Sequence, residues 1–324
     1  MNCLSSSIDA VLEATVIGSF SRVGYGVRSH LDRWQPPGSP NGLAGRTVLV
    51  TGATSGIGLA AAVQLAQRGA SVRFLARDEA RAEQALVNIQ KAASDDAEVS
   101  YDLADVSDFD GLRGFARGFA KANPRLDVLV HNAGALSRGF RQAADGTELT
   151  VAAQVFGPFL LTGLLLPILR HGVPGRVITV SSGGMYTQRF DLAEIEMNRQ
   201  NYDGTVAYAR AKRAQVVLNR EWARRVAADE VVFQAMHPGW VDTPGVASSL
   251  PTFYRLMRPL LRTPAQGADT VAWLAADAEP LDSTGGFWHD RRRRGEHRLP
   301  WTRNDDLGSR LWELCAARTV WELR

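Results

Sequence analysis

Short runs of consecutive apolar residues alternate with amphipathic stretches from residue 46 onward. Apolar runs of this length predict buried strands, and their alternation with helical patterns predicts a parallel sheet covered by helices on both faces. The sequence therefore predicts an α/β fold with a doubly wound parallel sheet of about seven strands. We expect these strands near residues 46–51, 71–76, 98–103, 126–131, 175–182, 231–237 and 286–289.

Two segments with different patterns flank this alternation. Apolar residues between positions 8 and 31 are spaced along one face of a helix, and the breaker-rich segment 35–40 follows. Such a helix either packs back onto the domain, which is the more common outcome, or lies on a membrane or partner. We expect a helical appendage and linker at residues 1–40, a catalytic domain at 41–290 and a basic extension at 291–324.

Composition and charge exclude several classes of protein. Apolar residues make up 45% of the 324 positions, and the net charge is only +3, so the chain is globular and nothing requires a nucleic acid. The arginines at 291–294 are typical of a solvated segment, with phosphate or an acidic membrane as the alternative. Cys3 and Cys315 give no disulfide framework and no metal site, which favours a cytoplasmic protein. Asp9 and Glu13 interrupt the N-terminal apolar stretch, so we expect no transmembrane span.

A glycine-rich turn follows the first predicted strand and precedes a helix. Its glycines have the spacing Gly-x-x-x-Gly-x-Gly, which differs from both the Gly-x-Gly-x-x-Gly and the Walker patterns. Without Cβ atoms the backbone can approach a phosphate, and the helix N-terminus supplies free N–H groups, as in Rossmann-type folds. A plain tight turn remains the alternative. We expect a dinucleotide to contact Gly52, Thr54, Ser55, Gly56, Ile57 and Gly58.

The end of the second predicted strand indicates which dinucleotide is bound. An acidic residue there would bind the ribose 2′-hydroxyl, whereas Arg77 offers a guanidinium to a 2′-phosphate. The sequence therefore predicts NADP(H) in preference to NAD. In the alternative interpretation Arg77 is solvated and Asp78 caps the next helix.

Tyr208 and Lys212 lie four residues apart in a helix-compatible stretch, so they share one helix face. The lysine cation is expected to lower the pKa of the phenol, so that Tyr208 protonates a developing alkoxide in reduction and removes the hydroxyl proton in oxidation. A chance surface pair would have the same spacing. Ser182, with Ser181 as the alternative register, ends the fifth strand and is expected to bind the substrate oxygen.

Four motifs occur in the order found in short-chain dehydrogenases/reductases: the glycine turn, His131-Asn-Ala-Gly134, the strand-five serine and Tyr-x-x-x-Lys. Over residues 44–290 the chain resembles that family, which implies an oxidoreductase acting on an alcohol/carbonyl pair and a homodimer or homotetramer. The resemblance implies that Lys212 binds the nicotinamide ribose. It also implies cofactor contacts at Asp102, Leu103, Asn132, Ala133, Gly134, Pro238, Gly239 and Thr243.

Two positions depart from the family pattern. His131 stands where the family usually has asparagine, so the structural hydrogen bonds of that amide are either met by an imidazole or lost. Gln154 stands where the family has a helix asparagine that holds a proton-relay water. That asparagine acts largely through its main-chain carbonyl, so one alternative is that Gln154 preserves the water if the helix is kinked in the same way. The hypothesis is a slower relay or a somewhat different substrate geometry.

The substrate is indicated only coarsely. Met185, Tyr186, Trp240 and the apolar residues within 246–261 predict an apolar wall, which favours a lipid-like carbonyl, although core packing or a dimer surface explains the same pattern. A catalytically silent NADP-binding regulator or scaffold is the rival hypothesis. Such a protein would not need a proton relay, but it would not need the intact serine, tyrosine and lysine either.

Overall fold

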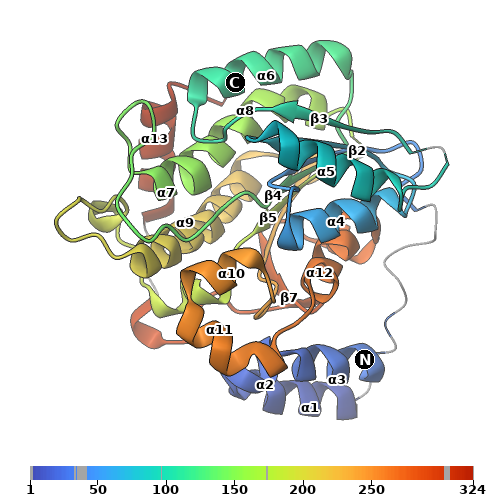
Figure 1. Ribbon diagram of the computed structural model, residues 1–324, viewed down its shortest axis with the longest axis vertical. Helices are drawn as coiled ribbons and strands as arrows, with labels where there is room; N and C mark the ends of the chain where they lie inside the picture. Colours follow the sequence, from blue (N-terminus) through green and yellow to red (C-terminus); the bar gives the residue numbers. More distant parts are fainter. Residues whose placement is uncertain are drawn as a thin grey trace.

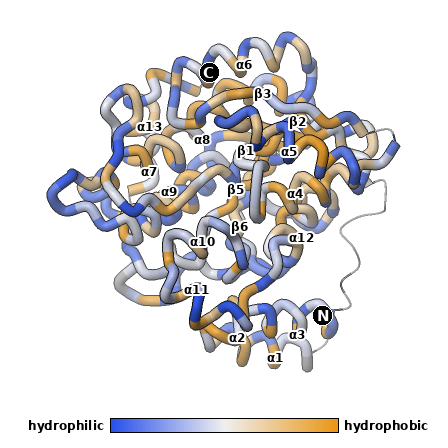
Figure 2. Tube along the Cα trace, in the orientation of Figure 1, coloured by the Kyte–Doolittle hydropathy of each residue, from blue (hydrophilic) through white to orange (hydrophobic). Residues whose placement is uncertain are grey.

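Eight strands of the described residues form one sheet with helices on both faces, and a set of short helices lies at one end of the molecule (Figure 1). The computed structural model describes residues 3–32, 34, 42–95, 97–172, 174–302 and 307–323. The linker expected at 35–40 lies outside these residues. Figure 2 shows the more hydrophobic segments running through the middle of the molecule, with hydrophilic segments on the outer loops.

The strand order is β3-β2-β1-β4-β5-β6-β7-β8, and every pair is parallel except β7 with β8. The doubly wound fold expected from the sequence is thus confirmed, with one more strand than the seven expected. The order reverses between β1 and β4, which opens a crevice at the carboxyl ends of these strands. The strands are β1 (Thr47–Thr51), β2 (Ser71–Ala76), β3 (Val99–Leu103), β4 (Val128–His131), β5 (Gly175–Val180), β6 (Val231–Met236), β7 (Gly286–His289) and β8 (Arg292–Arg293).

Two apolar clusters cover the two faces of the sheet. The central strands are buried on both faces, which explains why they are almost entirely apolar. On one face pack α4 (Gly56–Ala66), α5 (Glu79–Gln90) and α12 (Pro264–Ala276). On the other pack α6 (Phe109–Ala122), α8 (Gly157–Leu169), α9 (Gly204–Arg225) and α13 (Gly308–Thr319). The short helices α7 (Leu149–Val151), α10 (Pro244–Ser249) and α11 (Pro251–Met257) lie along connecting segments.

The helical pattern at residues 8–31 forms three short helices instead of one. They are α1 (Cys3–Ala14), α2 (Val16–Phe20) and α3 (Arg22–Leu31). Thr15 and Ser21 interrupt the helix because each side chain accepts a hydrogen bond from a backbone N–H of the following turn. The three helices pack back onto the domain at the end where α11 lies (Figure 1).

The arginine run is part of the fold, and the expectation that it is solvated is wrong for three of its four residues. Asp290 and Arg291 have φ values of 54° and 53° and form the two-residue turn between β7 and β8. The side chains of Arg291, Arg292 and Arg294 are 10%, 11% and 9% exposed, and each pairs with an aspartate. Their partners are Asp269 in α12, Asp9 in α1 and Asp32 just after α3, so the β7–β8 turn is bonded to the N-terminal helices.

One helical stretch has the length and apolar character of a membrane span. It runs over Leu149–Leu169, with a mean hydropathy of 1.8 in its most apolar window, and 83% of that window is buried inside the domain. Pro167 lies inside α8 near its end. Burial against the sheet accounts for its composition, as for the core helix of a globular domain.

Candidate active site

The glycine turn lies between β1 and α4, at the carboxyl edge of the sheet. Gly52 has φ 71° and Gly56 has φ 56°, a backbone region that favours glycine. A Cβ on Gly52 would lie 2.8 Å from the Cα of Ala133, and a Cβ on Gly58 would collide with the Gly52 carbonyl. The backbone therefore turns tightly before α4, and the N-cap Ser55 makes no side-chain cap hydrogen bond, which leaves the first N–H groups of α4 for a phosphate. These residues fit a dinucleotide.

Other expected cofactor residues are held around the same turn. Asn132 donates from Nδ2 to the carbonyls of Thr51 (3.2 Å) and Gly52 (3.0 Å), which fixes the end of β4 against the turn. Thr243 caps α10 and lies beside Gly56, where an added Cβ would come within 3.2 Å of its methyl group. The structure thus brings residues from three separate segments to one crevice.

The adenosine side of the crevice carries a basic residue. Arg77 follows β2, is 64% exposed, and has one contact with Asp105 at 3.5 Å. Its guanidinium is therefore accessible to a ligand. Asp102 on β3 is paired with Arg73 through two hydrogen bonds, and Leu103 is 52% exposed at the end of the same strand.

Ser182, Tyr208 and Lys212 meet where β5 ends and α9 passes. The hydroxyl of Ser182 lies close enough to the Tyr208 phenol to lower the pKa of the phenol. The hydroxyl of Ser181 instead donates to the Lys212 carbonyl (2.8 Å), so the structure places Ser182 beside the phenol. The Lys212 ammonium lies 5.5 Å from the centre of the Tyr208 ring and donates to the Val180 carbonyl (2.9 Å).

The electrostatics of this group differ from the expectation that Lys212 lowers the pKa of the phenol. Burial raises the pKa of Tyr208, and the nearby Ser182 hydroxyl offsets only part of this increase. Burial also lowers the pKa of Lys212 from 10.5 to about 7, because its side chain is fully enclosed without a carboxylate partner. Tyr208 therefore holds its proton at neutral pH, as a proton donor must.

Replacing Lys212 by methionine is expected to stabilise the protein. The pKa of Lys212 is lower in the folded state, so between about pH 7 and 10.5 the unfolded chain binds one more proton than the folded chain. The wild type therefore loses stability as the pH falls through that window. We expect Lys212→Met to unfold with a free energy about 1–3 kcal/mol higher at pH 7, because the unpaired Val180 carbonyl offsets part of the gain. Urea unfolding at pH 7 and 9.5 measures this; an equal difference at both pH values would contradict it.

His131 and Gln154 line a cavity of about 20 Å³ together with Thr162 and Gln215, and this cavity is large enough for one water molecule. Burial lowers the pKa of His131 to about 3, so the imidazole is neutral, and Nε2 is 2.7 Å from the Thr162 hydroxyl. In the described structure, three buried atoms around this cavity have no hydrogen-bond partner: His131 Nδ1, Gln154 Oε1 and Gln215 Oε1.

Gln154 lies in a π-helical stretch, Ala152–Phe156, so the helix is irregular here, as preservation of the relay water requires. Its main-chain carbonyl, however, accepts a hydrogen bond from Gln215 Nε2 (2.7 Å), and its side chain donates to the Ala135 carbonyl (3.0 Å). The ammonium of Lys212 is instead directed to β5. The hydrogen bonds that the structure gives Gln154 and Lys212 therefore do not connect the two residues.

The expected apolar wall is only partly a pocket. Met185 is fully buried and Tyr186 donates to the Gly295 carbonyl (2.8 Å), so both belong to the core. This corrects their assignment to the substrate wall. Trp240 is partly buried and contacts the ring of Phe253 in α11, 5.2 Å between centres, so the helices after β6 do border the crevice. The contacts of Phe20 and Arg262 with this region had no local sequence signal.

Comparisons with known proteins agree with this geometry. The family model for short chain dehydrogenase matches residues 46–252. Dehydrogenase/reductase SDR family member 12 of Homo sapiens is 40% identical over 256 residues, covering 79% of this chain and 80% of that protein. Retinol dehydrogenase 12 of Homo sapiens is 34% identical over 276 residues, covering 84% and 85%. The Pseudomonas aeruginosa RhlG/NADP active-site complex is 25% identical, covers 77% of this chain and 96% of its own, and has a TM-score of 0.63. The chain belongs to the short-chain dehydrogenase/reductase family.

Proposed function

We propose that the protein is an NADP(H)-dependent oxidoreductase that interconverts an apolar carbonyl compound and its alcohol. The observation that carries this proposal is the meeting of Ser182, Tyr208 and Lys212 at the carboxyl end of β5, beside the glycine turn. When bound, the nicotinamide ring supplies or accepts the hydride. Related proteins support the proposal, since the family match at residues 46–252 includes the glycine turn, Ser182, Tyr208 and Lys212.

Each side chain has a separate task in carbonyl reduction. Ser182 donates a hydrogen bond to the substrate oxygen, which stabilises the charge that develops there. Tyr208 transfers its phenolic proton to the same oxygen, and the raised pKa keeps that proton in place until the oxygen becomes basic. Lys212 in its charged form, with its ammonium 5.5 Å from the centre of the ring, stabilises the phenolate that remains.

The substrate is proposed to be apolar because of the helices that border the crevice. The segment from Pro244 to Leu261 contains no acidic residue, and α11 presents Phe253 beside Trp240. Retinol dehydrogenase 12 is named for an apolar alcohol, which supports long-chain or isoprenoid carbonyls as the first compounds to test. Such substrates would bury most of their surface in the crevice.

The cofactor preference rests on Arg77. We expect Arg77→Glu to weaken NADPH binding roughly 10- to 100-fold, or about 1.4–2.8 kcal/mol, because a carboxylate repels the 2′-phosphate. NADH binding should change much less, since NADH has a hydroxyl at that position. Isothermal titration of both nucleotides measures the ratio. Arg117→Glu, an equal charge change on exposed α6, is the control; similar loss for both nucleotides would contradict the assignment.

Turnover tests the function itself. The purified protein is incubated with NADPH or NADH and a panel of aldehydes, ketones and lipid carbonyls, and nucleotide oxidation is followed. Oxidation that depends on the carbonyl and is faster with NADPH supports the proposal. Tight NADPH binding without oxidation across the panel would instead support the rival hypothesis of a silent regulator.

A further inference from the structure

The last residue of α2 reaches into the domain next to the active-site crevice. Phe20 is 4% exposed, and its ring lies 4.6 Å from His237, 5.4 Å from His289, 5.9 Å from Trp240 and 6.4 Å from Tyr186, measured between ring centres. His237 follows β6 and Trp240 lies on the segment expected to contact the nicotinamide. An N-terminal residue thus packs directly on that part of the site.

The backbone at the end of α2 is bonded to the same segment. The Phe20 carbonyl accepts hydrogen bonds from the Trp240 N–H (2.8 Å) and from Arg262 Nε (3.0 Å). Arg262 also donates to the carbonyls of Ser19 (2.8 Å) and Ser21 (3.2 Å). Because the carboxyl end of a helix exposes unpaired carbonyls, a guanidinium is well matched to it.

Arg262 connects this helix end to the loop after β6. Its side chain donates to the Pro238 carbonyl (3.3 Å) and forms a two-pronged pair with Asp290 (2.5 and 2.8 Å). Its backbone N–H donates to the Trp240 carbonyl (2.7 Å), and its carbonyl accepts from the Asp242 N–H (2.8 Å). One buried arginine therefore fixes the loop through both its side chain and its main chain.

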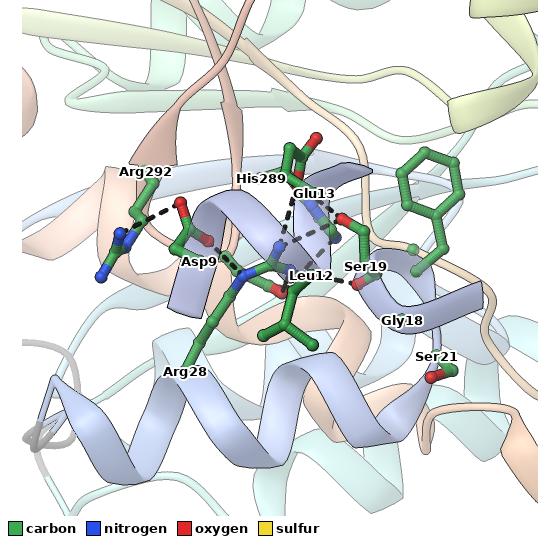
Figure 3. A network of polar contacts seen from close by, with 12 residues as sticks. Asp9, Leu12, Glu13, Gly18, Ser19, Ser21, Arg28, His289 and Arg292 are labelled. Atoms are coloured by element: carbon green, nitrogen blue, oxygen red, sulfur yellow. Dashed lines mark hydrogen bonds and ion pairs between the residues drawn. The ribbon is translucent and has the colours of Figure 1, made fainter. Parts of the chain in front are cut away.

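A second buried arginine attaches α3 to the same carboxylate. Arg28 is 1% exposed and bonds to Asp290 (2.7 Å), Asp9 (2.7 Å) and Glu13 (2.9 Å). Figure 3 shows Arg28 reaching from α3 to the acidic residues of α1 and to Ser19. Burial favours a neutral Asp9, but hydrogen bonds and charge from Arg294 and Arg28 hold the pKa of that carboxyl well below its usual range. Asp9 is therefore ionised at neutral pH, and its bonds to Arg28 connect α1 to α3 on either side of α2.

Two glycines show how closely α2 approaches the site. A Cβ on Gly183, next to Ser182, would collide with the Phe20 ring. A Cβ on Gly239, which has φ 76°, would lie 2.6 Å from both the Phe20 carbonyl and Arg262 Nε. Residues 182–183 and the loop after β6 thus both need glycine where they pack against α2.

We propose that α2, through Phe20 and Arg262, positions the two loops that enclose the nicotinamide half of the cofactor, residues 182–183 and 238–243. The proposal rests on the proposed function, which assigns the nicotinamide to this side of the crevice. Phe20 and Arg262 are positioning residues, since they act through the loops. The N-terminal helices, which lie outside the family match at 46–252, therefore complete the active site.

The test uses calorimetry to distinguish binding of the nicotinamide half of the cofactor from binding of the adenosine half. Full-length wild type, Phe20→Ala and Phe20→Leu are titrated with NADPH and with 2′,5′-ADP, which lacks the nicotinamide. We expect Phe20→Ala to weaken NADPH binding about tenfold, because small misplacements of binding loops have large effects. Binding of 2′,5′-ADP should stay within about twofold, and Phe20→Leu should restore most of the NADPH affinity because it refills the space.

Two further variants keep the test decisive. Phe159→Ala removes an equally buried ring from α8, packed on Trp222 and Trp312, and should leave both affinities unchanged. Arg262→Lys keeps the charge but loses the planar guanidinium with its paired N–H donors. If Phe20→Ala does not fold, this variant should show the same weaker NADPH binding with little change in 2′,5′-ADP binding. Equal weakening of both ligands, or unchanged NADPH binding, would overturn the inference while leaving the proposed function intact. A wild type that binds neither nucleotide would overturn both.

Discussion

Replacing Tyr208 by phenylalanine is expected to lower kcat for carbonyl reduction by about 10²- to 10⁴-fold, the range associated with loss of a positioned proton donor. The phenylalanine ring keeps the packing above Lys212 but cannot protonate the substrate oxygen. The affinity for NADPH should change little, because the substitution removes one hydroxyl and leaves the glycine turn intact. Steady-state kinetics together with calorimetric titration of NADPH measure both quantities.

The control for this variant is Tyr101→Phe, which removes a phenolic hydroxyl from β3 at the edge of the sheet. Its kcat should remain within about twofold of the wild-type value, as expected for a change away from the reacting atoms. A Tyr208→Phe variant with wild-type kcat would show that another group donates the proton, and the assignment of the catalytic group would then be wrong.

Asp290→Asn is expected to lower the free energy of unfolding by about 3–5 kcal/mol, the cost of breaking a buried ion pair on one side. The carboxylate is 2% exposed and bonds to Arg28 and Arg262, which are each 1% exposed. Asparagine has nearly the same shape and tolerates the positive φ of this turn, so the lost charge accounts for the effect. Its amide would also direct N–H groups at guanidinium donors. Urea unfolding followed by circular dichroism gives the difference.

Asp110→Asn provides the matched control, because the same chemical change is made in a carboxylate that is 99% exposed and pairs with Arg113 at 3.4 Å. Exposed pairs of this kind contribute about 0–1 kcal/mol. If Asp290→Asn were as mild as this control, the attachment of the N-terminal helices would not depend on the buried network.

Much of the fold followed from local patterns. The seven expected strands all exist within one or two residues of their predicted ends, because fully buried strands must be almost entirely apolar and their neighbours must contain turn residues. The glycine turn and the Tyr208–Lys212 pair were found for the same reason, since their function depends on spacing along one segment. Such constraints are visible in a single sequence.

The missing parts depend on contacts between distant segments. Arg28 and Asp290 are 262 positions apart, and nothing near either residue indicates a partner. The arginines at 291–294 resemble a solvated run when they are considered alone. A useful signal was present in the opposite charges, because Asp9 and Glu13 interrupt an otherwise apolar N-terminal pattern and need cations once buried.

The pKa of Lys212 also could not be predicted from spacing. A lysine one turn from a tyrosine lowers the phenol pKa only if the ammonium stays charged, and that depends on how deeply the fold buries it. Here the side chain is 3% exposed and bonds to a neutral carbonyl, so its own pKa falls to about 7. Burial thus reverses an expectation that was reasonable for a solvated helix face.

The most direct test of the account is hydride transfer from the cofactor to a carbonyl carbon at this site. NADPH carrying deuterium at the transferable position of the nicotinamide is incubated with the protein and the apolar carbonyl panel, and the alcohol products are analysed by mass spectrometry. The account predicts one deuterium on the carbinol carbon with the wild type and almost none with Tyr208→Phe. Tight NADPH binding with no deuterated alcohol from any carbonyl, or equal labelling by both proteins, would contradict it.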